Sequence, residues 1–117
     1  MLAVYTELEA TVFEELSPVE FVKCRRDGEF WQLLDVRETW EIELARVADA
    51  LRIPMRNIVE RLGELDTERP IAVLCHTGIR SALVAGYLAR SGFGRVANIR
   101  GGIDAWSVDV DPGIPRY

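Results

Sequence analysis

The feature that most constrains the fold is a short apolar run that ends at a cysteine. Residues 71–74 read Ile-Ala-Val-Leu and follow Pro70, a pattern typical of a central parallel strand that is buried on both faces. A glycine-containing polar stretch comes next, and small residues then favour a helix over about residues 80–90. The sequence therefore predicts a strand–loop–helix unit with Cys75 at the carboxyl end of the strand.

Further strands and helices alternate around this unit. Ser17 suits a helix N-cap, Pro18 the first turn, and Glu20 the reciprocal bond of a capping box. Helices are expected over 17–28, 38–44, 56–65 and 103–106, and strands over 31–36, 50–53 and 95–99. Such alternation predicts an α/β fold, with a mostly parallel central sheet flanked by helices on both sides. Cys75 then lies at the edge where parallel sheets hold their reactive crevices.

Length and charge limit the possible functions. A chain of 117 residues fits a single domain spanning 1–117, and 49% hydrophobic residues can supply its core. The formal net charge of −5 argues against general binding to nucleic acid or to an anionic membrane, since both need a basic face. A local pocket can still accept a small anion.

The cysteine and histidine content argues against a metal site. Cys24 and Cys75 do not form a CxxC pair, and one histidine is too few for a usual zinc site. The sequence shows no signal peptide and no apolar run long enough to cross a bilayer. We therefore expect a cytoplasmic location, where Cys75 stays a free thiol. Cys24 is expected to be an inert thiol within a helix.

The loop after the strand can make Cys75 a nucleophile. Backbone N–H groups of the loop and of the following helix stabilise negative charge, which favours the reactive thiolate. Gly78 allows the loop to curl, and His76 and Arg80 add positive or potentially positive groups. A lone cysteine after an apolar strand is usually a small core residue. Gly78, Arg80 and Ser81 at these spacings instead favour a catalytic cysteine.

The loop and two other segments resemble a known family. Residues 75–81, Cys-His-Thr-Gly-Ile-Arg-Ser, resemble the active-site loop of the rhodanese family. Residues 34–38, Leu-Asp-Val-Arg-Glu, resemble its Asp-Val-Arg signature. Residues 92–93, 96–99 and 101–106 resemble its closing motif. Three segments in the expected order make this resemblance more specific than any one of them.

The resemblance implies a rhodanese-like fold and a two-step sulfur transfer through a Cys75 persulfide, of the thiosulfate sulfurtransferase type. The donor would be a small sulfur anion such as thiosulfate, and the acceptor a thiol or a protein; no cofactor is implied. Separately from the resemblance, we expect a monomer. Asp35 and Arg37 would brace the loop, unless they form only a structural ion pair. The resemblance assigns donor binding to the rest of the loop: His76, Thr77, Gly78, Ile79, Arg80 and Ser81. Trp106 would line the cleft.

Two other functions stay open. A non-enzymatic persulfide carrier, fed by a partner protein, would use the same cysteine. A cysteine phosphatase or arsenate reductase typically places five residues between cysteine and arginine, whereas four separate Cys75 from Arg80, so the smaller loop favours sulfur. Residues 45–50 depart from the family pattern, because the usual histidine and glycines are absent, and the preceding helix can continue there.

Overall fold

The structure, a computed structural model, describes residues 13–117 and contains one parallel sheet. Its strands are β1 (Glu14–Leu16), β2 (Gln32–Asp35), β3 (Leu51–Arg52), β4 (Ile71–Leu74) and β5 (Val96–Ile99). They lie in the order β1-β5-β4-β2-β3, and every neighbouring pair is parallel. The chain leaves β2 toward one edge of the sheet and leaves β4 toward the other, so the switch point lies between these strands.

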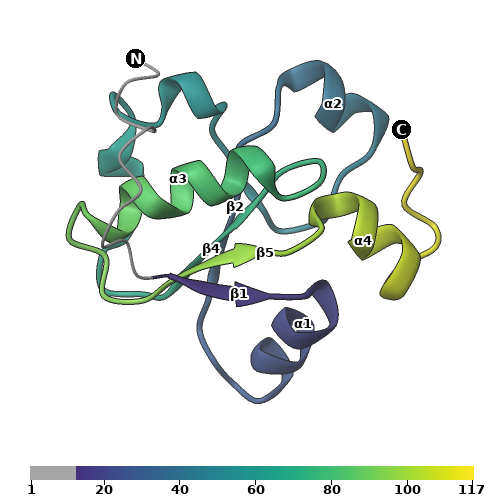
Figure 1. The fold of residues 1–117 in the computed structure, drawn as a ribbon, viewed down its shortest axis with the longest axis horizontal. Helices are drawn as coiled ribbons and strands as arrows, with labels where there is room; N and C mark the ends of the chain where they lie inside the picture. The colour runs from purple at the N-terminus through teal and green to yellow at the C-terminus, as the bar shows by residue number, and fades with distance from the viewer. Residues whose placement is uncertain (1–12) are drawn as a thin grey trace.

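Helices cover both faces of the sheet, as expected from the sequence (Figure 1). They are α1 (Pro18–Arg26), α2 (Thr39–Leu44), α3 (Ile79–Ala89) and α4 (Gly102–Asp109). In Figure 1, α3 lies on one side of the sheet, and α1 and α4 lie on the other. Helix α1 contacts α4, and α3 contacts β4 and β5. No helix within residues 13–117 has the length and hydrophobicity needed to cross a bilayer.

Strand β4 separates two hydrophobic clusters. Ile71, Val73 and Cys75 belong to the cluster on the α3 face, whereas Ala72 and Leu74 belong to the cluster that α1 and α4 cover. Side chains of a strand alternate between its two faces, so an apolar residue is needed at every position when both faces are buried. The Cys75 side chain consequently lies on the same side of the sheet as α3.

The local signals for α1 are confirmed. The Glu20 backbone N–H donates to Ser17 Oγ at 3.1 Å, and the Ser17 N–H donates to Glu20 Oε1 at 2.7 Å. Two backbone groups at the helix start are therefore satisfied by neighbouring side chains.

The prediction of a helix over residues 56–65 was wrong. Two short 3₁₀ segments, η2 (Met55–Asn57) and η3 (Leu62–Glu64), replace it, and most backbone bonds there span three residues. Ile58 and Leu65 are nevertheless buried. The apolar spacing therefore correctly indicated which residues are buried, but it did not indicate the type of helix. Gly63 inside the segment weakens a continuous helix, and the tight turns place the same apolar side chains against α3.

One strand and the ends of two helices also differ from the sequence expectations. Strand β1 was missed because its residues lack an apolar run and become a strand only by pairing with β5. Helix α2 stops at Leu44, since Ala45 is extended, so residues 45–50 do not continue it. Helix α4 runs to Asp109, beyond the expected 103–106.

Candidate active site

Cys75 directly follows β4, at the carboxyl edge of the sheet. It is only 1% exposed, and its Sγ accepts a hydrogen bond from the Gly78 backbone N–H at 3.1 Å. Ser81 Oγ lies 3.2 Å from the same sulfur. Gly78 has φ 103°, a conformation that disfavours side chains, and a Cβ there would lie 3.1 Å from the Gly101 nitrogen. The loop therefore folds back over the sulfur and directs an N–H group at it.

The start of α4 holds the other side of the loop. The Ile103 N–H donates to the Cys75 carbonyl at 2.9 Å, and the Asp104 N–H donates to the His76 carbonyl at 3.1 Å. Gly102, with φ 63°, permits this close approach, because a Cβ at that position would lie 2.6 Å from the Cys75 carbonyl oxygen. These bonds satisfy the backbone carbonyl groups of Cys75 and His76 and attach the loop to the start of α4.

A polar chain extends from buried Cys75 through buried Ser81 and Asn98 to exposed Glu15 on β1. Ser81 Oγ donates to Asn98 Oδ1 at 2.5 Å, and Asn98 Nδ2 donates to Glu15 Oε1 at 3.0 Å. Because the Ser81 hydrogen points to Asn98, the Ser81 oxygen can accept from a Cys75 thiol. A thiolate would instead require this hydrogen to turn toward the sulfur. Sequence reasoning missed Asn98 and Glu15, although an asparagine inside an apolar strand is a signal.

Arg80 is held by a carboxylate that sequence reasoning also missed. Its Nη1 and Nη2 donate to the two oxygens of Glu41 at 2.7 and 2.8 Å. The Arg80 side chain is 34% exposed, whereas that of Glu41 is 4% exposed. The hydrogen bonds to Glu41 raise the pKa of Arg80 above its usual range. The positive charge of Arg80 is therefore already balanced by the Glu41 carboxylate of α2.

The surroundings keep Glu41 ionised. Burial raises the pKa of Glu41, but hydrogen bonds from Arg80, from the Glu38 backbone and from Tyr117 outweigh it and lower the pKa to about 2. A carboxylate with a lowered pKa stabilises the folded state above its unfolded pKa, near 4.5, and loses that contribution as the pH falls toward 2. Folding stability and the Arg80–Glu41 pair are therefore linked in this acidic window.

Glu41→Gln is expected to lower the free energy of unfolding at neutral pH by about 2 kcal/mol, because it leaves part-buried Arg80 without its carboxylate. Urea unfolding of both proteins between pH 7 and pH 2 measures the difference, which should shrink below about pH 4.5 as Glu41 becomes protonated in the unmodified protein. Glu43→Gln, an exposed neighbour on α2, is the control. An unchanged difference down to pH 2 would show that charge is not the cause.

Asp35 and Arg37 form a fully buried ion pair at the end of β2. Arg37 Nη2 lies 2.7 Å from Asp35 Oδ2, and both side chains are 0% exposed. Arg37 also donates to the Ala45 carbonyl at 2.8 Å and to the Tyr117 hydroxyl at 2.9 Å. These bonds tie β2 to the end of α2 and to the tail. The connection of the pair to the Cys75 loop is indirect. Arg37 bonds to Tyr117, whose ring stacks on His76, and to the carbonyl of Glu41, whose carboxylate bonds to Arg80.

Tyr117 connects this ion pair to the Cys75 loop. Its hydroxyl donates to Glu41 Oε2 at 2.8 Å, and its ring stacks on His76 with centroids 4.0 Å apart and planes 7° apart. Burial raises the pKa of Tyr117 to about 12, so the hydroxyl keeps its proton at neutral pH. One residue of the tail therefore orients Glu41 and covers His76, a contact that no sequence pattern indicated.

Tyr117→Phe is expected to lower stability by about 1 kcal/mol, since it removes two hydrogen bonds but preserves the ring on His76. Tyr117→Ala should cost more, because the stack is lost as well. Thermal or urea unfolding of both variants separates the two contributions. Equal losses in the two variants would contradict an independent role for the stack.

The remaining predicted residues lie in different surroundings. Thr77 and Ile79 are exposed at the rim of the loop, and Ile79 is 73% exposed. Trp106 does not line a cleft; it is buried beneath α1, with its ring 5.8 Å from that of Phe21. Cys24 lies within α1 as predicted and is a free, partly buried thiol. Residues 13–117 contain no group of three or more potential metal ligands among histidine, cysteine and acidic side chains.

Comparisons with known proteins agree with this arrangement. The sequence profile of the rhodanese-like domain matches residues 18–109. A protein of Allochromatium vinosum named sulfurtransferase is 41% identical over 69% of this chain and 76% of its own length. A rhodanese-like domain protein from Staphylococcus aureus has a similar structure, with a TM-score of 0.76 and 27% identity over 90% of this chain and 99% of that one.

The same kind of domain also occurs within longer proteins. A chloroplastic rhodanese-like/PpiC domain-containing protein of Arabidopsis thaliana is 43% identical over 74% of this chain, which spans only 30% of that protein. The profile match covers the Asp35–Arg37 segment, the whole Cys75 loop and α4, and the fold of the structural relative extends over nearly the entire described region. The chain therefore belongs to the rhodanese-like domain family.

Proposed function

We propose that this protein is a sulfurtransferase that carries a sulfane sulfur as a persulfide on Cys75. The observation that carries the proposal is the short loop around the sulfur, in which the Gly78 N–H and the Ser81 hydroxyl group both lie within hydrogen-bond distance of Sγ. The Gly78 N–H can stabilise a Cys75 thiolate, and the Ser81 hydroxyl can do so once its hydrogen turns from Asn98 toward Sγ. The relative named sulfurtransferase supports this class of activity.

The first step loads the cysteine. The Cys75 thiolate attacks the outer sulfur of a donor such as thiosulfate and forms a new S–S bond. The bond between that outer sulfur and the sulfite group breaks, and sulfite leaves with the electron pair. In the second step, an acceptor thiolate attacks the terminal sulfur of the persulfide, and the Cys75 thiolate is the leaving group. The charges and electrons balance without any cofactor.

The size of the loop favours sulfur over phosphate. Only four residues separate Cys75 from Arg80, and the Gly78 N–H already points at the sulfur. Gly78 also packs closely against the backbone of Gly101, since a Cβ at Gly78 would lie 3.1 Å from the Gly101 nitrogen. A phosphoryl group needs several inward N–H donors around three oxygens, so a curled loop of this size fits a single added sulfur better.

The rim of the site suits a protein acceptor. Ile79, at the rim of the Cys75 loop, is 73% exposed, and Trp40 on α2 is 59% exposed. Large exposed apolar side chains around a polar site are typical of surfaces that contact other proteins. A small thiol needs no such surface. We therefore expect a protein thiol or persulfide to be the better exchange partner.

A persulfide carrier is the second candidate, and the state of Arg80 favours it. Both guanidinium nitrogens that face α2 are engaged by Glu41. An anionic donor would meet an arginine whose charge is already balanced, so thiosulfate would bind weakly. A partner protein that delivers sulfur directly to Cys75 would not depend on that charge.

The test is the intact mass of the purified protein after incubation with thiosulfate and then with cyanide. Loading should add about 32 Da, one sulfur atom, and cyanide should remove it. Cys75→Ser should gain nothing. If thiosulfate fails but a small-molecule persulfide loads Cys75, the carrier function is supported. If neither donor loads a folded protein, the proposed function is wrong.

A further inference from the structure

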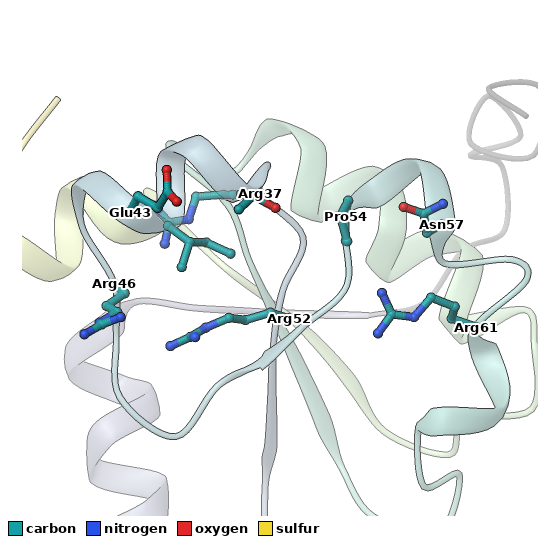
Figure 2. Close-up of a pocket in the computed structure, with 9 residues that line it drawn as sticks. Arg37, Glu43, Arg46, Arg52, Pro54, Asn57 and Arg61 are labelled. Carbon is teal, nitrogen blue, oxygen red and sulfur yellow. The ribbon is translucent and has the colours of Figure 1, made fainter.

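A second feature lies on the far side of α2 from Cys75. A pocket of about 370 Å³ separates α2 from the segment that joins β3 to η2 (Figure 2). Its lining includes the apolar side chains of Ile42 and Pro54 and four arginines: Arg37, Arg46, Arg52 and Arg61. Arg46, Arg52 and Arg61 are the arginines of the lining outside the buried Asp35–Arg37 pair. Figure 2 shows these three arginines arranged around one side of the pocket, with Glu43 on the α2 side. We call this feature the α2 groove.

Two of these arginines are available to a ligand. Arg61 is paired with Glu64 at 2.7 Å. Arg46 and Arg52 are exposed, and neither forms an ion pair with a carboxylate within residues 13–117. Arg46 and Arg52 thus line one pocket without a carboxylate bonded to either, although the chain as a whole has a net charge of −5. The groove is therefore a place where negatively charged groups of a ligand can bind.

The groove is longer than one pocket. A second hollow of about 390 Å³ shares Ile42, Glu43 and Arg46 with the first and continues to Gly113 and Pro115 in the tail. The shared residues make one surface that follows α2. A small ion would fill only one part of it, whereas an extended polypeptide could occupy both hollows. Side chains of an extended segment alternate, so one set can contact the arginines while the other contacts Ile42.

The groove also lies close to the Cys75 loop. Arg52 ends β3 and Asp35 ends β2, so the groove opens at the same edge of the parallel sheet as the Cys75 loop. Helix α2 separates the two sites: Glu41 on one side holds Arg80, and Ile42 and Glu43 on the other line the groove. A protein bound along α2 would thus be held beside the loop.

We propose that the α2 groove binds an extended acidic segment of the protein that exchanges sulfur with Cys75. The proposal rests on the proposed function for the identity of the partner, but the binding itself needs no reactive cysteine. Carboxylates of the segment pair with Arg46 and Arg52, and its alternate apolar side chains rest on Ile42 and Pro54. Glu43 opposes the segment, which makes an alternating acidic and apolar sequence a better fit than a continuous acidic run.

Fluorescence anisotropy with a labelled peptide of alternating Glu and Leu, about ten residues long, tests this surface. The Arg46→Gln/Arg52→Gln double variant should bind it about tenfold or more weakly, because two charge-assisted contacts are lost. Lys23→Gln/Arg26→Gln, which removes the same charge from exposed positions on α1, should bind as the unmodified protein does. Glu43→Gln should bind more tightly, and Cys75→Ser should bind normally.

The outcomes separate this proposal from the proposed function. Sulfur transfer from thiosulfate to cyanide should be unchanged in the Arg46→Gln/Arg52→Gln variant, because cyanide needs no docking surface. Failure of the peptide to bind, or equal weakening in the α1 control, would overturn the groove proposal. So would equal competition by inorganic phosphate or tighter binding of a single-stranded oligonucleotide. Failure of both thiosulfate and a small-molecule persulfide to load Cys75, with normal peptide binding, would instead overturn the proposed function.

Discussion

Cys75→Ser is expected to abolish sulfur transfer, with a loss of turnover of about 10⁴-fold or more. A serine hydroxyl is protonated at neutral pH, and an alcohol oxygen cannot carry sulfur as a persulfide. The substitution is nearly isosteric, and the Gly78 N–H can donate to the new oxygen as it does to Sγ. The fold should therefore survive, and the loss should be entirely chemical.

Steady-state assays with thiosulfate and with a small-molecule persulfide, each with cyanide as acceptor, measure this effect. Cys24→Ser is the matched control, because Cys24 is the other free thiol and lies within α1. It should retain full activity. Turnover that persists in Cys75→Ser, or that disappears in Cys24→Ser, would contradict the assignment of Cys75 as the sulfur carrier.

Gly102→Ala is expected to lower the free energy of unfolding by about 3 kcal/mol. The residue has φ 63°, and its added Cβ would meet the carbonyl groups of Cys75 and His76. These are backbone atoms, which cannot move aside as a flexible side chain can. Either α4 or the Cys75 loop must shift, and the bonds from Ile103 and Asp104 to the loop would weaken. Sulfur loading should fall together with stability.

Urea unfolding of Gly102→Ala and Gly94→Ala makes the comparison. Gly94 has no atom within 4 Å of an added Cβ and lacks a positive φ, so its substitution should change stability by no more than about 0.5 kcal/mol. Similar stabilities for the two variants would show that α4 does not hold the Cys75 loop as the structure describes.

Local patterns in the chain predicted the fold class and the position of Cys75 at the carboxyl end of β4. An apolar run can be buried on both faces of a parallel sheet wherever it lies, so residues 71–74 identify β4 without further information. Ser17 and Glu20 cap α1 through bonds between neighbours in sequence. The apolar spacing over 56–65 failed as a helix signal, because burial of Ile58 and Leu65 is compatible with tight turns as well.

The sequence by itself determined the α/β sheet, the strand that ends at Cys75 and the loop that curls at Gly78, because these depend on residues close together in the chain. Only the tertiary structure decided which groups surround that loop. Glu41 balances the charge of Arg80, Asn98 accepts a hydrogen bond from Ser81, and the Tyr117 ring stacks on His76. Each of these contacts joins residues from different elements. Their partners are chosen by how the helices pack at the sheet edge, which no local pattern records.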